Sequence, residues 1–194
     1  MGKFGWGLLI GLLTFPVLGA IYLLSGSAPA AVTDHPFPFE RLIAGVALGA
    51  HIHRDAPKRD LSSFTTADII AGADSYRKGC GGCHGLPEVT RVRPEPAMYP
   101  PPPQLFTPDG YVTDDPVGVT YWKIKNGIRM TGMPSFEKLF TDEQMWQIAA
   151  LLANANKLPP QALDTLKQPL FPPPPPPPPS GAAPSRPAAP KPAK

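Results

Sequence analysis

The sequence has 194 residues, a formal net charge of +3 and 30 prolines. Because each proline fixes φ and removes a backbone donor, about three times the usual share of roughly 5% excludes a large regular sheet or one continuous helical bundle. Residues 1–60, 61–160 and 161–194 carry net charges of +1, −1 and +3, so the middle stretch lacks the basic face that nucleic-acid binding requires. We therefore expect one small folded core between two appendages, and no nucleic-acid partner.

The N-terminus contains an uncharged apolar run over residues 4–24. About 20 apolar residues span a bilayer as a helix, and Trp6 and Tyr22 lie near the two ends, where interfacial aromatic side chains are found. Residues 28–30 (Ala-Pro-Ala) loosely fit a cleavage pattern, so a removed signal segment is the alternative. We expect residues 1–25 to be an uncleaved transmembrane anchor in a bacterial inner membrane, with the rest of the chain on the exported, periplasmic side.

Residues 26–60 are expected to connect the anchor to the core and to contain a short helix over residues 40–53. The small residues of this helix suit close packing against the membrane surface or a protein partner. His51 and His53 raise the possibility of a metal site, but an i, i+2 spacing does not place both on one helix face. An ordinary polar helix end is the favoured interpretation.

Residues 61–160 carry the pattern of a small helical domain. One helix is predicted from about 66 to 78, and a second begins at Asp115-Pro116 and ends at Gly127. A third begins at the capping box formed by residues 141–144, and Pro159-Pro160 are expected to end it. Since no stretch alternates as a strand does, the expected fold class is all-α.

The most specific motif is Cys80-Gly81-Gly82-Cys83-His84. The spacing C-x-x-C-H is that of c-type haem attachment, in which two thiols add to the haem vinyl groups and the histidine ligates iron. A structural zinc site needs four ligands, and the sequence has no other cysteine. A thioredoxin-type dithiol needs a βαβ context, which is missing from this pattern. The motif therefore predicts one covalent haem c.

A second axial ligand of the haem iron is expected from a methionine. Met133 is favoured, because Pro134 holds an extended loop that can direct the thioether toward iron. Met130 is the alternative, and a vacant or histidine-ligated site is a further one. Met98 is a further candidate ligand, whereas Met145 has the spacing of a helix-core residue. Ligation by His84 and Met133 would raise the reduction potential and leave no site on iron for a substrate.

These motifs together resemble the class I monohaem cytochrome c domain. The matching segments are Gly72 and Tyr76, Cys80 to Gly85, Pro103-Gln104-Leu105, Asn126-Gly127-Ile128, Gly132-Met133-Pro134, and Trp146 in the closing helix. The resemblance covers roughly residues 66–157 and implies three main helices around one haem, with Gly72 at a close crossing of the first and last, and with Tyr76 and Trp146 packed there. It implies that the Pro103 carbonyl accepts the Nδ1 proton of His84, with Pro87 as the alternative acceptor. The pocket residues it implies are Tyr76, Leu105, Tyr121, Trp122, Ile128 and Phe136.

The C-terminal stretch, residues 161–194, is of low complexity and includes eight consecutive prolines at 172–179. We expect it to be a disordered tail with a stiff polyproline segment, either an inert spacer or a docking element for a second protein. The expected function of the whole chain is electron transfer between respiratory or photosynthetic redox partners, without enzymatic activity. The alternative is a fixed cytochrome c subunit of a membrane oxidase or dehydrogenase complex, and a haem enzyme or sensor is a third hypothesis.

Overall fold

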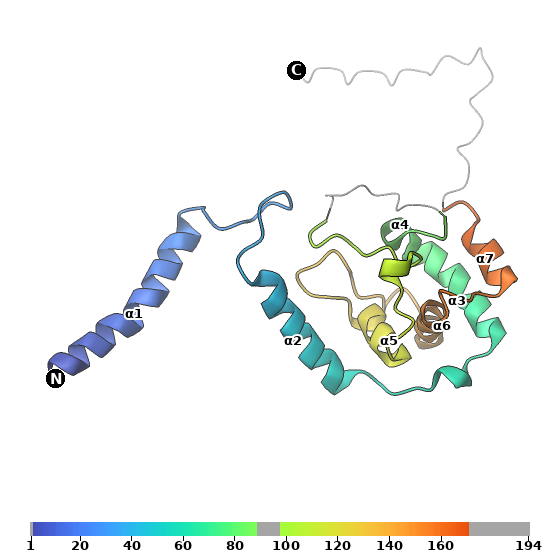
Figure 1. Ribbon diagram of the computed structural model, residues 1–194, viewed down its shortest axis with the longest axis horizontal. Coiled ribbons are helices and arrows are strands. Elements are labelled where there is room, and N and C mark those ends of the chain that lie inside the picture. Colours follow the sequence, from blue (N-terminus) through green and yellow to red (C-terminus); the bar gives the residue numbers. More distant parts are fainter. Residues whose placement is uncertain (1, 89–97, 171–194) are drawn as a thin grey trace, which may run out of the picture.

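A computed structural model describes residues 2–88 and 98–170 of the chain (Figure 1). Within these ranges the protein is built from helices and loops and contains no strand, which confirms the expected all-α fold. The α-helices are α1 (Lys3–Leu24), α2 (Glu40–Asp55), α3 (Thr66–Gly79), α4 (Gly81–His84), α5 (Val117–Asn126), α6 (Asp142–Ala153) and α7 (Pro160–Leu166), with 3-10 turns at Leu61–Ser63 and Pro108–Gly110. The consecutive prolines at 172–179 lie outside the described residues.

The centre of the fold is the crossing of α3 and α6. A Cβ built on Gly72 in α3 would lie 2.2 Å from the carbonyl oxygen of Gln147 in α6, so only glycine permits this approach. Around the crossing, the side chains of Tyr76 and Ile148 are fully buried and that of Trp146 is nearly so. The prediction of a close crossing at Gly72 is confirmed.

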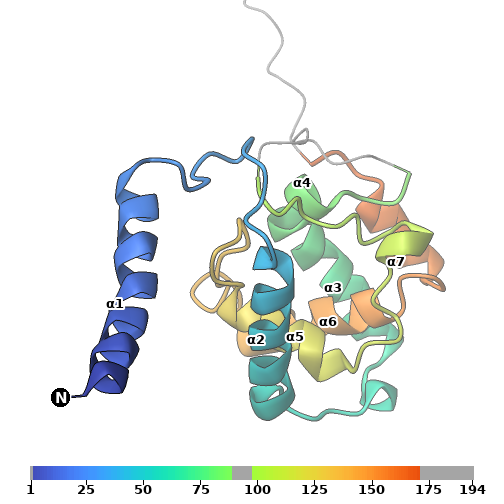
Figure 2. The same cartoon turned by 60° about the vertical axis from the view of Figure 1, so that its left-hand side comes forward.

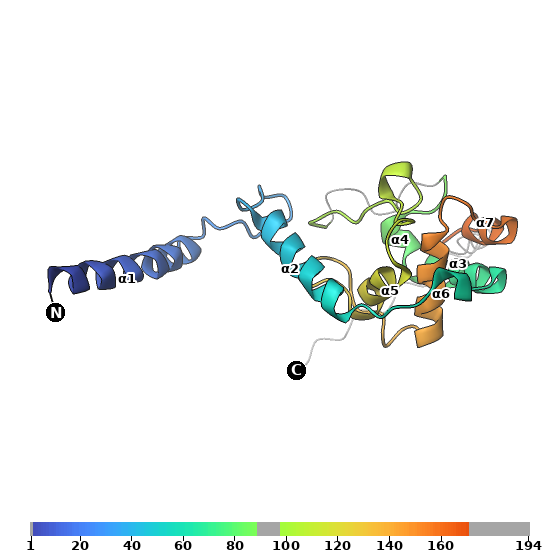
Figure 3. The ribbon, with the colours of Figure 1, turned by 60° about the horizontal axis from the view of Figure 1, so that its bottom comes forward.

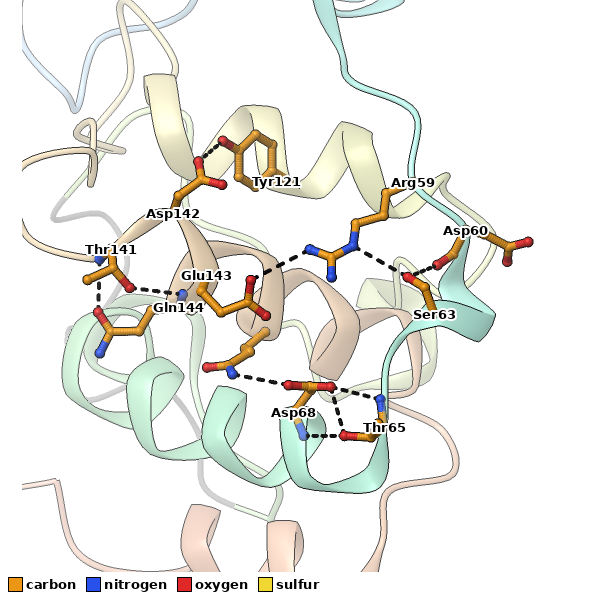
Figure 4. A network of polar contacts seen from close by, with 11 residues as sticks. Arg59, Asp60, Ser63, Thr65, Asp68, Tyr121, Thr141, Asp142, Glu143 and Gln144 are labelled. Atoms are coloured by element: carbon orange, nitrogen blue, oxygen red, sulfur yellow. Dashed lines mark hydrogen bonds and ion pairs between the residues drawn. The ribbon is translucent and has the colours of Figure 1, made fainter.

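Both helices begin with a capping box (Figure 4). At the start of α3, the backbone N–H of Asp68 donates to the Thr65 hydroxyl while the Asp68 carboxylate accepts from the Thr65 N–H. Thr141 and Gln144 make the same reciprocal pair at the start of α6. Each capping box satisfies two N–H groups that would otherwise have no partner at the start of the helix. The boxes therefore fix the residues at which α3 and α6 begin.

Helix α5 packs across α6 through stacked aromatic rings. The Tyr121 and Trp146 rings have centroids 4.0 Å apart and planes 12° apart, and the Tyr121 hydroxyl donates to Asp142. Gly127 caps the end of the helix after Asn126, as predicted, but Pro116 caps its start and Val117 is its first residue. The start was therefore predicted one residue too early.

Helix α7 is a correction to the expected domain boundary. Pro159-Pro160 were expected to end the third helix and residues 161–194 to be a disordered tail, but α6 already ends at Ala153 and Pro160 is the first residue of α7. Proline suits that position because the first helical N–H groups have no partner in the helix. Ala162 and Leu166 are completely buried against α3, so the folded domain continues past residue 160.

The two N-terminal helices differ in how they contact the domain. The end of α2 packs on α5, where Ile52 is buried and the His51 ring meets Trp122 edge-on with centroids 5.4 Å apart. Helix α1 buries none of its residues and lies apart from the domain (Figures 1 and 3). Its length and composition are sufficient to cross a membrane. Figures 1 and 3 place α2 between α1 and the rest of the domain, and Figure 2 shows α2 lying across the near side of the domain.

The segment between α2 and α3 is held on the domain by Arg59. Its guanidinium lies 4.1 Å from the centroid of the Phe64 ring and 5.2 Å from that of Trp146, and it approaches Glu143 at 3.8 Å (Figure 4). A Cβ on Gly118, at the start of α5, would lie 1.7 Å from the Pro57 carbonyl oxygen. The chain thus crosses α5 in backbone contact before it enters α3.

Candidate haem-binding site

The two cysteines and His84 share a single helical turn that directly follows α3. Cys80 is the C-cap of α3 and the N-cap of α4, and its carbonyl accepts the N–H groups of Cys83 at 3.0 Å and His84 at 2.9 Å. Both thiols are free, that of Cys80 buried and that of Cys83 half-buried. The pKa of the Cys80 thiol is raised to about 12, mainly because the thiol is buried and to a lesser extent because Cys83 lies beside it. The turn brings together two thiols and an imidazole, the donor set that covalent haem attachment uses.

His84 is oriented by the proline-rich segment that follows the attachment turn. Its Nδ1 lies 2.9 Å from the Pro103 carbonyl oxygen, and the Leu105 N–H donates to the His84 carbonyl at 3.2 Å. Because a carbonyl only accepts, this contact places a proton on Nδ1, and in the neutral imidazole Nε2 is then the nitrogen that can ligate a metal. The expected contact of Pro103 with His84 is confirmed, and the alternative of Pro87 is not supported.

Tyr76 supports the same turn from inside the domain. Its hydroxyl donates to the Gly85 carbonyl at 3.0 Å, and the Phe106 ring packs edge-on against it at 5.2 Å between centroids. Burial raises the pKa of Tyr76 well above its ordinary value, so the phenol remains neutral. Tyr76 was predicted as a haem-binding residue, and the structure places it in the core beneath the attachment turn.

Met133 belongs to a loop that is bonded to the end of α5. The Met133 carbonyl accepts from the Ile128 N–H at 3.1 Å, and the Met133 N–H donates to the Thr131 hydroxyl at 3.1 Å. Gly127 has φ 69°, and a Cβ there would lie 2.6 Å from the Pro134 carbonyl carbon. Gly127 is therefore required for the loop to close over the helix end, and the half-buried Met133 packs against the hydrophobic core.

The other methionines occupy different environments. Met145 is 1% exposed in the core of α6, as its spacing predicts, and Met130 is 88% exposed with a left-handed φ of 63°. The sequence did not predict where the Met98 side chain lies. Its sulfur lies only 2.2 Å from where a Cβ on Gly132 would be. Gly132 thus leaves room for Met98 beside the Met133 loop, and Met133 as the axial ligand stays a prediction.

The predicted pocket residues have different surroundings in the structure. Leu105 is buried beside the attachment turn, and Phe136 stacks on Phe140 at 5.6 Å between ring centroids. Tyr121 and Trp122 have other aromatic partners, in α6 and α2 respectively. Their contact with haem, like that of Ile128, stays a prediction.

Sequence reasoning missed two contacts at the attachment turn. A Cβ on Gly81 would lie 3.0 Å from the Leu170 side chain, and one on Gly79 would lie 2.6 Å from the Phe140 ring. Leu170 follows α7, and Arg77 donates to the adjacent Pro169 carbonyl at 3.0 Å. The helical spacing of the apolar residues Ala162 and Leu166 could have predicted α7. The many prolines in this part of the sequence instead led to the prediction of a tail without structure.

Comparison with known families identifies this part of the chain. Residues 67–152 match the family model described as cytochrome C oxidase, cbb3-type, subunit III. This segment is a c-type cytochrome domain. The match extends over the attachment turn, the Pro103 segment and the Met133 loop, and it covers less than half of the chain. Comparisons with curated proteins and with solved structures give no match.

A c-type cytochrome domain implies haem c, and the residues of the attachment turn fit it. The donor set of two thiols and an imidazole is the one that haem c requires, and the contact of His84 Nδ1 with a backbone carbonyl is the kind that orients a metal-ligating imidazole. No cluster of three or more carboxylate, histidine or cysteine ligands for another metal occurs among residues 2–88 and 98–170. His51 instead contacts Asp55 at 3.1 Å, which agrees with the interpretation of an ordinary helix end.

Proposed function

We propose that this chain is an electron-transfer protein that holds one haem c covalently through Cys80 and Cys83, with His84 and Met133 as the axial ligands of iron. The contact of 2.9 Å between His84 Nδ1 and the Pro103 carbonyl carries this proposal, because it fixes the imidazole as a ligand residue requires. The match of residues 67–152 to a cytochrome family model also supports a haem protein.

The bound haem c supplies an iron that gains and loses one electron. Around it, His84 is kept in one tautomer by Pro103, and the hydrogen bonds to Ile128 and Thr131 hold Met133 in its loop. A methionine ligand favours the reduced iron more than a second histidine would, so this pair gives a high potential. Because His84 and Met133 would both ligate the iron, a substrate would have no position on it, and we propose that the chain is not an enzyme.

We further propose that α1 anchors the protein in a bacterial inner membrane and that the cytochrome domain lies on the periplasmic side. The apolar character of α1, none of which is buried in the protein, supports an anchor. Residues 1–25 remain uncleaved in this proposal, and removal of a signal segment is the alternative. A tether keeps the domain near membrane-bound redox partners and raises its effective concentration there.

A fixed subunit of a membrane oxidase or dehydrogenase is the second candidate function. The observation that favours it is the packing of α2 on α5, which attaches the connector to the domain rather than leaving it as a free tether. The family that matches is described as a subunit of an oxidase, which points in the same direction. Purification in mild detergent separates the two, because a fixed subunit retains its neighbours and a mobile carrier does not.

Spectroscopy of the purified protein tests the haem and its ligands. A pyridine haemochrome spectrum should show two thioether bonds, and a chain with both Cys80→Ala and Cys83→Ala should carry no covalent haem. The ferric protein should show the weak long-wavelength band of methionine ligation, and Met133→Ala should abolish it while Met130→Ala should not. Rapid carbon monoxide binding to the reduced protein together with absence of that band would instead support a haem enzyme or a sensor.

A further inference from the structure

Helix α2 has two faces of different character. One face contacts the domain through Ile52, which is buried, through His51 on Trp122, and through Arg41, whose Nε donates to the Tyr99 hydroxyl at 3.3 Å. In the first half of the helix the opposite face carries apolar side chains and no charged one, and Arg54 follows Ile43 on this face three turns later. These are Leu42, Ile43 and Val46, which are 62%, 65% and 64% exposed.

The start of α2 lies beside the end of the apolar helix α1. The rings of Tyr22, near the end of α1, and Phe37 have centroids 6.2 Å apart. The Phe37 N–H donates to the Glu40 carboxylate at 2.9 Å, which joins Phe37 to the first turn of α2. Aromatic side chains at the end of a membrane helix lie at the level of the lipid headgroups. The contact with Phe37 therefore brings the start of α2 to that level.

We infer that the outer face of α2, formed by Leu42, Ile43 and Val46, lies in the headgroup region of the bilayer that α1 spans. The inference rests on the proposed anchoring by α1. Lipid is the partner of this face, because only fifteen residues separate the end of α1 at Leu24 from the start of α2 at Glu40, and Phe37 returns to the end of the proposed span. Helices with an apolar face and a polar face bind in the interface plane in this way.

The consequence for function is a fixed orientation of the domain. The inner face of α2 is held on α5 by Ile52 and His51, and the backbone that follows α2 is in contact with α5 at Gly118. A helix that is bound to lipid on one face and to the domain on the other prevents the domain from rotating freely on its anchor. Redox partners in the same membrane then meet one defined side of the cytochrome domain.

Spin-label accessibility in the full-length haem protein tests this inference. In the proposed haem protein both native thiols, those of Cys80 and Cys83, would be bonded to haem, so Val46→Cys provides a single reactive thiol. Asp164→Cys, on an exposed residue of α7, is the matched control. The label is measured in nanodiscs of phosphatidylcholine and phosphatidylglycerol by its collision rates with oxygen, which partitions into lipid, and with a water-soluble nickel chelate. We expect the oxygen-to-nickel ratio to be several-fold higher at Val46 than at Asp164.

Three other outcomes have distinct meanings. A low ratio at Val46, equal to that at Asp164, in protein that is incorporated in nanodiscs overturns the inference while leaving the anchor intact. Protection at Val46 from both reagents that depends on the number of chains per nanodisc indicates a second copy on this face, and also overturns it. Failure of the full-length chain to enter nanodiscs contradicts the proposed anchoring itself, so the two failures are distinguishable.

Discussion

Replacing Gly127 by alanine should detach the Met133 loop from the end of α5. Gly127 has φ 69° and ψ −175°, a backbone region that non-glycine residues enter at a cost of about 1–3 kcal/mol. The new Cβ would also lie 2.6 Å from both the Pro134 carbonyl carbon and the Ser135 nitrogen, where ordinary contact begins at 3.4 Å. Backbone at these two residues would therefore have to move by about 0.8 Å, and such overpacking costs a further 1–3 kcal/mol or so.

The total of about 2–6 kcal/mol exceeds the 1.4 kcal/mol or so that changes an equilibrium tenfold, so the native loop should no longer predominate. We expect Gly127→Ala to lose the long-wavelength ferric band of methionine ligation and to have a lower reduction potential, since the methionine ligand raises it. The measurements are the oxidised spectrum and a redox titration of the purified haem protein. Arg129→Ala, at an exposed residue of the same loop, is the control and should change neither.

Retention of the band and the potential by Gly127→Ala would refute the reasoning, because the loop would then tolerate a Cβ at its tightest contact. Loss of both in Arg129→Ala as well would refute it in another way. The loop would then be generally fragile, and the specific backbone requirement at Gly127 would not be the cause.

Three further perturbations test the rest of the domain. Leu166→Ala should lower the free energy of unfolding by about 2–5 kcal/mol in denaturant titrations, because its side chain is completely buried, and no effect would mean that α7 is not part of the core. Tyr76→Phe removes the buried donor to the Gly85 carbonyl and should cost about 1–3 kcal/mol in the same assay, whereas a neutral result would show that the bond is dispensable. Hydrogen bonds from the Thr65 N–H and, second, from the Thr65 hydroxyl lower the pKa of Asp68. The Asp68 carboxylate therefore stabilises the fold at pH values above the ordinary carboxyl pKa, and this contribution disappears as the pH falls through the lowered value. Thermal melts at several pH values should show this loss in the native chain and a flatter acid limb in Asp68→Asn.

The sequence predicted those features whose cause is local. The capping box at Thr141 needs only a hydroxyl and an amide group three residues apart, and the structure contains it. The attachment turn is equally local, because its donors lie within five residues. The contact of Pro103 with His84 is long-range, and it could be predicted because the family resemblance supplied it.

The features that the sequence did not predict depend on packing between distant segments. Pro159-Pro160 can end one helix or begin the next, and burial of Leu166 against α3 decides between them. Met98 approaches Gly132 across 34 positions of the chain, a distance that no local pattern spans. The contact of His51 with Trp122 likewise joins two segments that helical periodicity treats separately.

The folding unit of this chain is larger than the segment that matches a family. The match ends at residue 152. Beyond it, Ala162 and Leu166 are buried against α3, and the Leu170 side chain lies against Gly81, between Cys80 and Cys83. Removing the chain after residue 160 would expose apolar surface on α3 and uncover one side of the attachment turn. In the proposed haem protein, this C-terminal addition would therefore lie beside the attachment turn as well as in the core.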